Sequence, residues 1–261
     1  MTKLQIKSDR ITSFGGIYFV NRLFDQFSLG KVINDTLGLR STAHNGYQWD
    51  EIVKSLFDIY LCGSDHIEDI TSLMPCLSQA PDSHVPSSDT IGRGIKQLAT
   101  DNITYTAKSG NTYAFNTNEL LNDLLMKLNM AVGLFKSGQF LDVDFDHQFI
   151  PTEKHDATYS YKKAFGYFPG VASVGGVIVH VENRDGKTPV KFCQAETLKR
   201  LFASLRKHGL FIYRFRADCG SYSKEIVETI DAHSNLFYLR ASNCESAYTE
   251  FAKKKRWKTI E

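Results

Sequence analysis

Two different spacings of hydrophobic residues divide the chain near residue 135. Before that point apolar residues recur every three or four positions, which is the spacing of helices that bury one side. This pattern predicts helices over residues 17–27, 49–61, 66–73, 88–98 and 116–128, after a short extended segment over 4–11. Ser88-Asp89 should cap the fourth helix, and Pro75 should end the third. We therefore predict a mainly helical region over residues 1–135.

After Gly138 the hydrophobic residues form short runs typical of strands. The pattern predicts strands within residues 140–144, 171–181, 190–192, 211–217 and 236–240, and helices over 196–207 and from 223 onward. Residues 183–186, Asn-Arg-Asp-Gly, are a strong turn sequence and should connect the second and third strands as a hairpin. The order over residues 136–261, β-β-β-α-β-α-β, indicates an α/β sheet with strands in mixed directions.

Three aspartates interrupt the first of these strands, in the sequence QFLDVDFDH. Asp142, Asp144 and Asp146 alternate with hydrophobic residues, so their side chains should lie on one face of the strand. Strands disfavour Asp, and a buried carboxylate is costly without a cation or a hydrogen-bond donor. Asp218 directly follows the strand over 211–217 and would reach the same edge if these two strands pair. Such acids suit Mg²⁺ or Mn²⁺, hard cations that prefer oxygen ligands and promote phosphoryl transfer.

Simpler interpretations of these acids stay open. The first three could form an acidic loop at a strand end, and Asp218 could cap the following helix. His147 stands where a calcium-binding loop requires glycine, which argues against that kind of site. The histidines at 147, 155 and 180 match no compact zinc pattern, and the chain has neither a GxSxG motif nor a glycine-rich nucleotide loop.

The formal net charge of the 261-residue chain is only +2, so any binding of nucleic acid would depend on local basic patches. One candidate is the basic run over residues 253–258, which contains Trp257 and is otherwise interpreted as a solvated chain end. Arg93, Lys96 and Lys108 accompany the short N-terminal helices, which could form either a DNA-binding bundle or an ordinary helical domain. No clear helix-turn-helix signature decides between the two.

The expected cellular location is the cytoplasm. No hydrophobic run approaches the roughly 20 residues of a membrane-spanning helix, and the N-terminus lacks the apolar core of a signal peptide. Five scattered cysteines without a CxxC pair fit free thiols in a reducing compartment.

Four segments together resemble DDE transposases of bacterial insertion sequences, most closely the IS1380 group of the IS4-like set: FLDVDFD, YSYKKAFGYFPG, ENRDG and RADCGSYSKEIV. The resemblance covers roughly residues 135–261 and implies an RNase H-like catalytic core with bound Mg²⁺ (or Mn²⁺) that cleaves and joins DNA strands. It implies that Asp144 is the first catalytic acid and Asp218 the second, with Asp142 and Asp146 as further candidate metal ligands or structural residues.

The partners implied are double-stranded DNA at transposon ends and, in the complex, a second copy of the chain. The residues expected to contact DNA phosphates are all basic: Lys162, Lys163, Lys253, Lys254, Lys255 and Arg256.

One departure from the family pattern concerns the third catalytic acid, a Glu expected well downstream of the last strand. Glu245, Glu250 and Glu261 come too early for this role, so we expect the chain to be a fragment that ends before that acid. Whether this polypeptide is an active enzyme therefore stays open. The alternatives are a non-catalytic DNA-binding remnant and a metal-dependent nuclease of similar fold.

Overall fold

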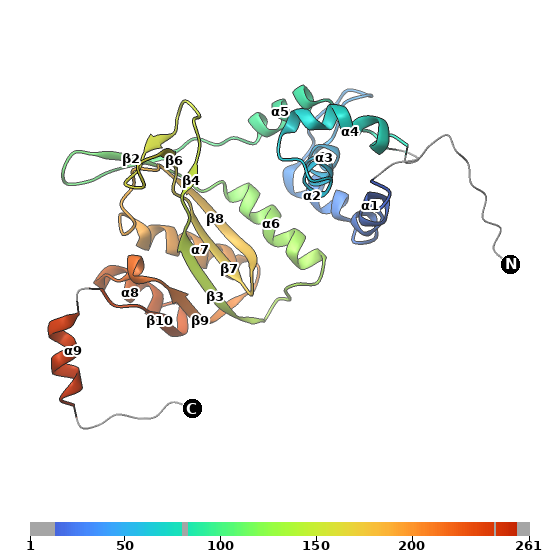
Figure 1. The fold of residues 1–261 in the computed structure, drawn as a ribbon. Helices are drawn as coiled ribbons and strands as arrows, with labels where there is room; N and C mark the ends of the chain where they lie inside the picture. Colours follow the sequence, from blue (N-terminus) through green and yellow to red (C-terminus); the bar gives the residue numbers. More distant parts are fainter. Residues whose placement is uncertain (1–13, 80–82, 243, 255–261) are drawn as a thin grey trace. The chain divides into compact units, whose positions relative to one another are not determined.

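The chain forms two compact units in a computed structural model that describes residues 14–79, 83–242 and 244–254 (Figure 1). The first unit contains residues up to 101 together with 118–135, and the second contains residues 102–117 together with those from 136 onward. The extended segment predicted over residues 4–11 lies outside the described residues.

The first unit is helical. Its elements are α1 (Ile17–Gln26), α2 (Leu29–Leu37), α3 (Trp49–Leu61), the 3₁₀ turn η1 (Ile67–Asp69), α4 (Ile70–Leu77), α5 (Ser88–Gln97) and α6 (Glu119–Ala131). Their apolar sides meet in one core, where Ile33, Ile52, Ile70 and Ile91 are almost completely buried. The periodicity that predicted these helices is thus the periodicity of the core contacts.

The ends of these helices differ in detail from the prediction. Ser87, not Ser88, caps α5, because its hydroxyl accepts a hydrogen bond from the Thr90 amide. Pro75 lies inside α4, which continues to Leu77. Helix α2 was not predicted. It follows Ser28, a residue with positive φ, and ends at Gly38 with φ of 82°.

The second unit is built on a seven-stranded mixed sheet. In spatial order its strands are β1 (Ile103–Thr106), β2 (Thr112–Asn116), β8 (Val177–Arg184), β7 (Gly170–Val174), β3 (Phe140–His147), β9 (Phe211–Ala217) and β10 (Ser234–Leu239). The pairs β3–β9 and β9–β10 are parallel, and all other neighbours are antiparallel. The predicted mixed α/β sheet is therefore confirmed.

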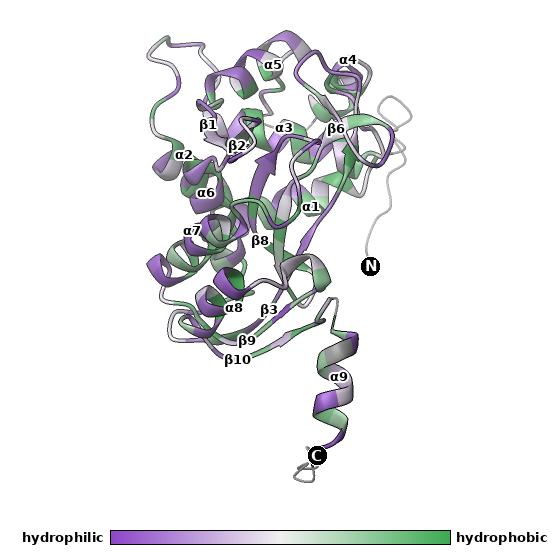
Figure 2. Ribbon diagram, turned by 90° about the vertical axis from the view of Figure 1, so that its left-hand side faces the viewer, coloured by the Kyte–Doolittle hydropathy of each residue, from purple (hydrophilic) through white to green (hydrophobic). Residues whose placement is uncertain are grey.

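Smaller elements complete the second unit. They are a three-stranded sheet of β4 (Ile150–Pro151), β6 (Phe165–Tyr167) and β5 (Thr158–Tyr159), the helices α7 (Gln194–Lys207), α8 (Lys224–Asp231) and α9 (Glu245–Ala252), and the 3₁₀ turn η2 (Cys219–Ser221). Helices α7 and α8 lie side by side against one face of the large sheet (Figure 2). Among the described helices, none is both long and apolar enough to cross a membrane.

Hydrophobic residues and aspartates alternate along β3, so the two kinds of side chain lie on opposite faces of the sheet. Leu141, Val143 and Phe145 are buried on the face covered by α7, where the Phe202 ring lies 5.7 Å from Phe215 of β9. The intervening aspartates consequently point to the opposite face. A β-bulge between Leu141 and Asp142 shifts the register with β9, so that both strands keep their hydrophobic residues on the α7 side.

The strands differ from the prediction in three places. Residues 103–106 and 112–116 form a hairpin within the region predicted as mainly helical, and β2 pairs with β8 in the second unit. The long hairpin turns at Gly175-Gly176, not at residues 183–186, because both glycines adopt the positive φ that a two-residue turn needs. Residues 190–192 form a turn and no strand, since the buried Arg184 guanidinium binds carbonyl groups there.

Candidate acidic site at one edge of the sheet

The parallel pairing of β3 and β9 brings the predicted acids together. Asp144 lies opposite Arg216 and Phe145 opposite Ala217, so Asp218 follows at the same edge. A pocket of about 750 Å³ opens there, and its wall includes the polar side chains of Asp144, Asp146, His147, Lys162, Arg216 and Asp218. Asp142, two residues before Asp144, lines a separate depression with Phe140 and Tyr213.

Arginines of β9 bind two of the aspartates. The Arg216 guanidinium donates to both Asp144 oxygens, at 2.7 Å from Nε and 2.8 Å from Nη2. Arg214 binds Asp142 in the same manner, at 3.1 Å and 2.9 Å. These four side chains are between 41% and 55% exposed, so both pairs are accessible to solvent and to ions.

Asp146 and Asp218 contact backbone amides instead. Asp146 accepts a hydrogen bond of 2.7 Å from the His147 amide, and Asp218 accepts one of 2.8 Å from the Gly220 amide at the start of η2. Asp218 therefore caps the turn η2, whereas Ser223 caps the following helix α8. Such a hydrogen bond fixes a carboxylate and leaves its negative charge in place.

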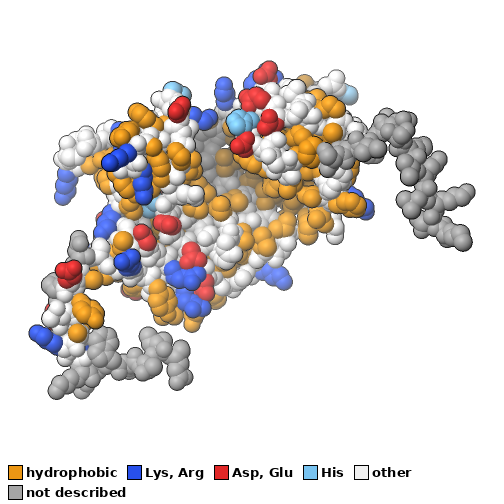
Figure 3. Space-filling model, viewed as in Figure 1, with side chains coloured by type: hydrophobic (Ala, Val, Ile, Leu, Met, Phe, Trp, Pro, Cys, Tyr) orange, Lys and Arg blue, Asp and Glu red, His pale blue; other side chains and the backbone are white. Residues whose placement is uncertain are grey.

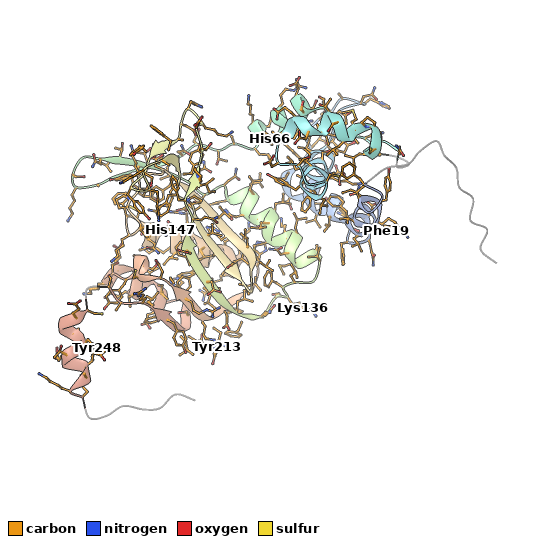
Figure 4. All side chains as sticks on the ribbon, viewed as in Figure 1. Phe19, His66, Lys136, His147, Tyr213 and Tyr248 are labelled. Carbon is orange, nitrogen blue, oxygen red and sulfur yellow. The ribbon has the colours of Figure 1, made fainter. Side chains whose placement is uncertain are left out.

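The acids of the pocket do not form a preassembled three-ligand site. Among the described residues, only Asp65, His66 and Asp69 of the first unit bring three potential ligand atoms within 4.8 Å of one another. That group is largely exposed, and Figure 4 labels its histidine. The carboxylates at the pocket have the oxygen chemistry that Mg²⁺ and Mn²⁺ prefer, yet both Asp144 oxygens are bound to Arg216.

His147, labelled in Figure 4, lines the pocket. Its Nε2 accepts a hydrogen bond from the buried Arg184, and its ring stacks on Phe168 at 5.6 Å. Burial and the neighbouring guanidinium lower the pKa of His147 to about 3. The imidazole is therefore neutral near pH 7 and acts as a hydrogen-bond acceptor toward Arg184.

A buried ion pair anchors α7 behind the sheet. The fully buried Glu182 of β8 accepts hydrogen bonds from Arg200 (2.6 Å and 3.0 Å) and Thr197 (2.5 Å) of α7, and from Thr117. Burial alone would raise the pKa of Glu182, but these hydrogen bonds hold it below its usual range. This ionised acid is satisfied by protein donors and is not a candidate metal ligand.

Aromatic and basic side chains lie together at the tip of the three-stranded sheet. Tyr159, Tyr161 and Phe165 are 56%, 63% and 55% exposed, and Lys162 Nζ lies 5.1 Å from the centre of the Tyr161 ring. Lys163 has a positive φ of 60° in the tight turn between β5 and β6. Tyr161 and Lys162 also line the acidic pocket. Hydrophobic and basic side chains are exposed next to one another on this part of the second unit (Figure 3).

The second predicted basic patch is described only in part. Lys253 and Lys254 follow α9, and the Lys254 ammonium lies 4.7 Å from the centre of the Phe251 ring. Lys255 and Arg256 lie outside the described residues.

Arg214 and Arg216 were missed as site residues, although the sequence contained a signal for them. Each stands on a predicted strand at a position that faces an aspartate once β3 and β9 pair in parallel. The spacing of two between the arginines matches the spacing of two between Asp142 and Asp144.

Comparison of the chain with protein-family models, curated proteins and solved structures finds no match.

Proposed function

We propose that the chain belongs to a DNA transposase that cleaves and joins strands at transposon ends by metal-dependent phosphoryl transfer. The observation that carries this proposal is the parallel pairing of β3 and β9, which brings Asp144 and Asp218 to one pocket. Acids held at the ends of adjacent strands are a common arrangement for ligand binding in α/β sheets.

The order of the strands supports an RNase H-like core. Counted from β3, the first three strands form an antiparallel meander, β3-β7-β8, and the next two, β9 and β10, lie on the other side of β3 and run parallel to it. The first strand is thus central and carries the first acid. Helices α7 and α8 provide the connections to β9 and β10.

Within this proposal Asp144 and Asp218 hold Mg²⁺ or Mn²⁺, with Asp146 nearby in the same pocket and Asp142 more distant. The bound ions would activate water or a 3′-hydroxyl and stabilise the leaving oxygen. The protein's own groups bind and orient the DNA. Lys162 at the pocket wall contacts a phosphate, and the exposed rings of Tyr159, Tyr161 and Phe165 offer surfaces for bases.

Further phosphate contacts are assigned to basic side chains outside the pocket: Lys163, Lys253, Lys254, Lys255 and Arg256. The partner is duplex DNA, and two copies of the chain bind it together as a homodimer. Binding of DNA should weaken steeply with salt because each neutralised phosphate releases counterions.

The test is nicking, by the purified protein, of duplex DNA that carries the element's terminal repeats. We expect nicking in Mg²⁺ or Mn²⁺ and none after chelation by EDTA. Asp144→Asn and Asp218→Asn should each lower the rate by roughly a hundredfold or more, since each removes a ligand of the metal that stabilises the reacting oxygens. Nicking that survives both substitutions would refute the assignment, and equal cleavage of unrelated DNA would indicate a metal-dependent nuclease.

A second candidate, a DNA-binding protein without catalytic activity, is favoured by one observation. Both oxygens of Asp144 are bound to Arg216, and no three ligand atoms of the described pocket lie close enough together to hold a cation. This candidate predicts salt-dependent binding of end DNA and no cleavage with any metal.

A further inference from the structure

Asp144 is neutralised by a residue of the neighbouring strand, which is unusual for an acid proposed to hold a cation. The Arg216 guanidinium occupies both carboxylate oxygens, and the two residues are register partners in the parallel pair β3–β9. The guanidinium uses one lone pair of each oxygen, and its positive charge repels a divalent cation at the remaining ones. Cation binding at Asp144 is therefore favoured when Arg216 moves away.

Arg216 has room to move. Its side chain is 55% exposed, and an exposed ion pair of this kind contributes little to folding stability, so breaking it is inexpensive. Arg216 also lines the acidic pocket together with Lys162. A guanidinium released from Asp144 would stay at the mouth of this pocket, where a DNA phosphate could accept its paired N–H groups.

We propose that Arg216 is an exchangeable partner of Asp144, which holds this carboxylate in the cation-free protein and contacts a DNA phosphate once a divalent cation has displaced it. The inference rests on the proposed function. It assigns Arg216 a positioning role toward Asp144 and a binding role toward the substrate. Binding of the cation and binding of DNA then reinforce each other, because the cation frees a phosphate-binding group.

The Arg214–Asp142 pair provides an internal control. It has the same chemistry, the same strands and a similar exposure, but Asp142 and Arg214 do not line the acidic pocket. Arg214 also packs on its neighbour Tyr213, with the guanidinium carbon 5.6 Å from the ring centre. This pair should stabilise the sheet without taking part in exchange.

The first measurement is Mn²⁺ affinity, followed by electron paramagnetic resonance or calorimetry on the full chain. Arg216→Gln should bind Mn²⁺ about two- to fivefold more tightly than the wild type, the effect expected from removing a competing exposed ion pair. Arg216→Lys keeps the charge and loses the paired N–H groups, so its affinity should lie between the two. Arg214→Gln should leave the affinity unchanged, and thermal unfolding should confirm that all variants are folded.

The second measurement is the salt dependence of binding to a short duplex, with Mn²⁺ and with EDTA. In Mn²⁺ the slope of log affinity against log salt should be smaller for Arg216→Gln than for the wild type by about 0.9, the value of one phosphate contact. In EDTA the two slopes should agree, because Arg216 is then bound to Asp144. If Arg216→Gln lowered the slope by the same amount in Mn²⁺ and in EDTA, the proposed exchange would be refuted.

The outcomes separate the inference from the proposed function. Mn²⁺ binding that disappears in Asp144→Asn but is unaffected by Arg216→Gln would overturn only the inference. If Arg214→Gln raised the Mn²⁺ affinity as much as Arg216→Gln does, the inference would also be overturned, because the effect would then come from net charge. Absence of Mn²⁺ binding in both the wild type and Arg216→Gln would overturn the inference and the proposed function together.

Discussion

His180, Glu182 and Arg184 alternate along β8, and all three are buried with at most 1% of their surface exposed. Glu182 and Arg184 have hydrogen-bond partners, whereas neither ring nitrogen of His180 has one among the described residues. Burial is the main reason that the pKa of His180 is lowered to about 4. The imidazole is consequently neutral in the folded protein at pH 7.

This burial predicts a pH dependence of stability. The unfolded chain binds a proton at His180 below its ordinary pKa of about 6.5, and the folded chain binds it only near pH 4. Neutral His180 therefore makes its full contribution to folding stability above about pH 6.5, and this contribution is lost as the pH falls toward 4. Between about pH 6 and 4.5, His180 should make the free energy of unfolding fall by close to about 1.4 kcal/mol for each unit that the pH is lowered. His147, with its pKa lowered to about 3, acts in the same direction.

The variant His180→Leu tests this prediction by urea unfolding at several pH values. In the same pH range, its free energy of unfolding should depend on pH less steeply than that of the wild type, by about 1.4 kcal/mol per pH unit. At pH 7 it should be equally stable or more stable by roughly 1 kcal/mol, because two unpaired buried nitrogens are removed. His44→Gln, which alters an exposed histidine, serves as the control for replacing a histidine elsewhere in the chain. A wild-type slope in His180→Leu would contradict the prediction.

At the scale of elements, the hairpin β7–β8 depends on its turn. Gly175 and Gly176 both have positive φ, of 58° and 86°, and connect the register partners Val174 and Val177. A side chain is strained in this conformation, and Asn tolerates it better than other residues. The long alternation of β7 and β8 on either side therefore depends on two residues without side chains.

Replacing Gly176 by Ala should lower the free energy of unfolding by about 1–2 kcal/mol, the usual cost of left-handed backbone for an L-residue. Gly176→Asn should cost less, since Asn is common in two-residue hairpin turns. Thermal or urea unfolding of both variants measures the difference. Equal stability of the Ala variant and the wild type would show that the turn adopts another conformation.

Local patterns predicted the main elements of residues 136–240 but missed β1, β2, the three-stranded sheet and α9, and one further error is informative. Helix α7 and strands β3 and β9 follow their hydrophobic periodicity, because the same residues form the contacts between them. The turn sequence at residues 183–186 was misinterpreted, since Arg184 is required as a buried partner for carbonyl groups of residues 189 and 190. A turn propensity carries no information about the groups that a buried side chain binds in the folded protein.

At the scale of the whole molecule, the chain crosses between its two units more than once. Residues 102–117 leave the first unit, form β1 and β2 in the second, and return to the first at α6. Phe115 of β2 is 1% exposed, and Thr117 binds Glu182. The second unit is therefore incomplete without a segment that precedes its main stretch in sequence.

Each unit has its own core, so damage to one should not spread evenly to the other. Phe115→Ala should destabilise the second unit by about 3–5 kcal/mol through the cavity that it leaves. Native-state hydrogen exchange followed by mass spectrometry should then show faster exchange in α7 and β8 than in α3. Ile52→Ala, in the core of the first unit, should give the opposite pattern. The same loss of protection in both units for either variant would show that they unfold together.

The sequence by itself determined the change of pattern near residue 135, the helical and strand periodicities and the acids worth considering. It did so because periodicity and residue type are local properties that tertiary contacts reinforce. Only the tertiary structure decided that β9 lies parallel to β3, which brings Asp218 to the pocket of Asp144 and places Arg216 on its carboxylate. Strand pairing joins residues more than 70 positions apart, and the matched spacing of two aspartates and two arginines does not by itself specify the partner strand or the register.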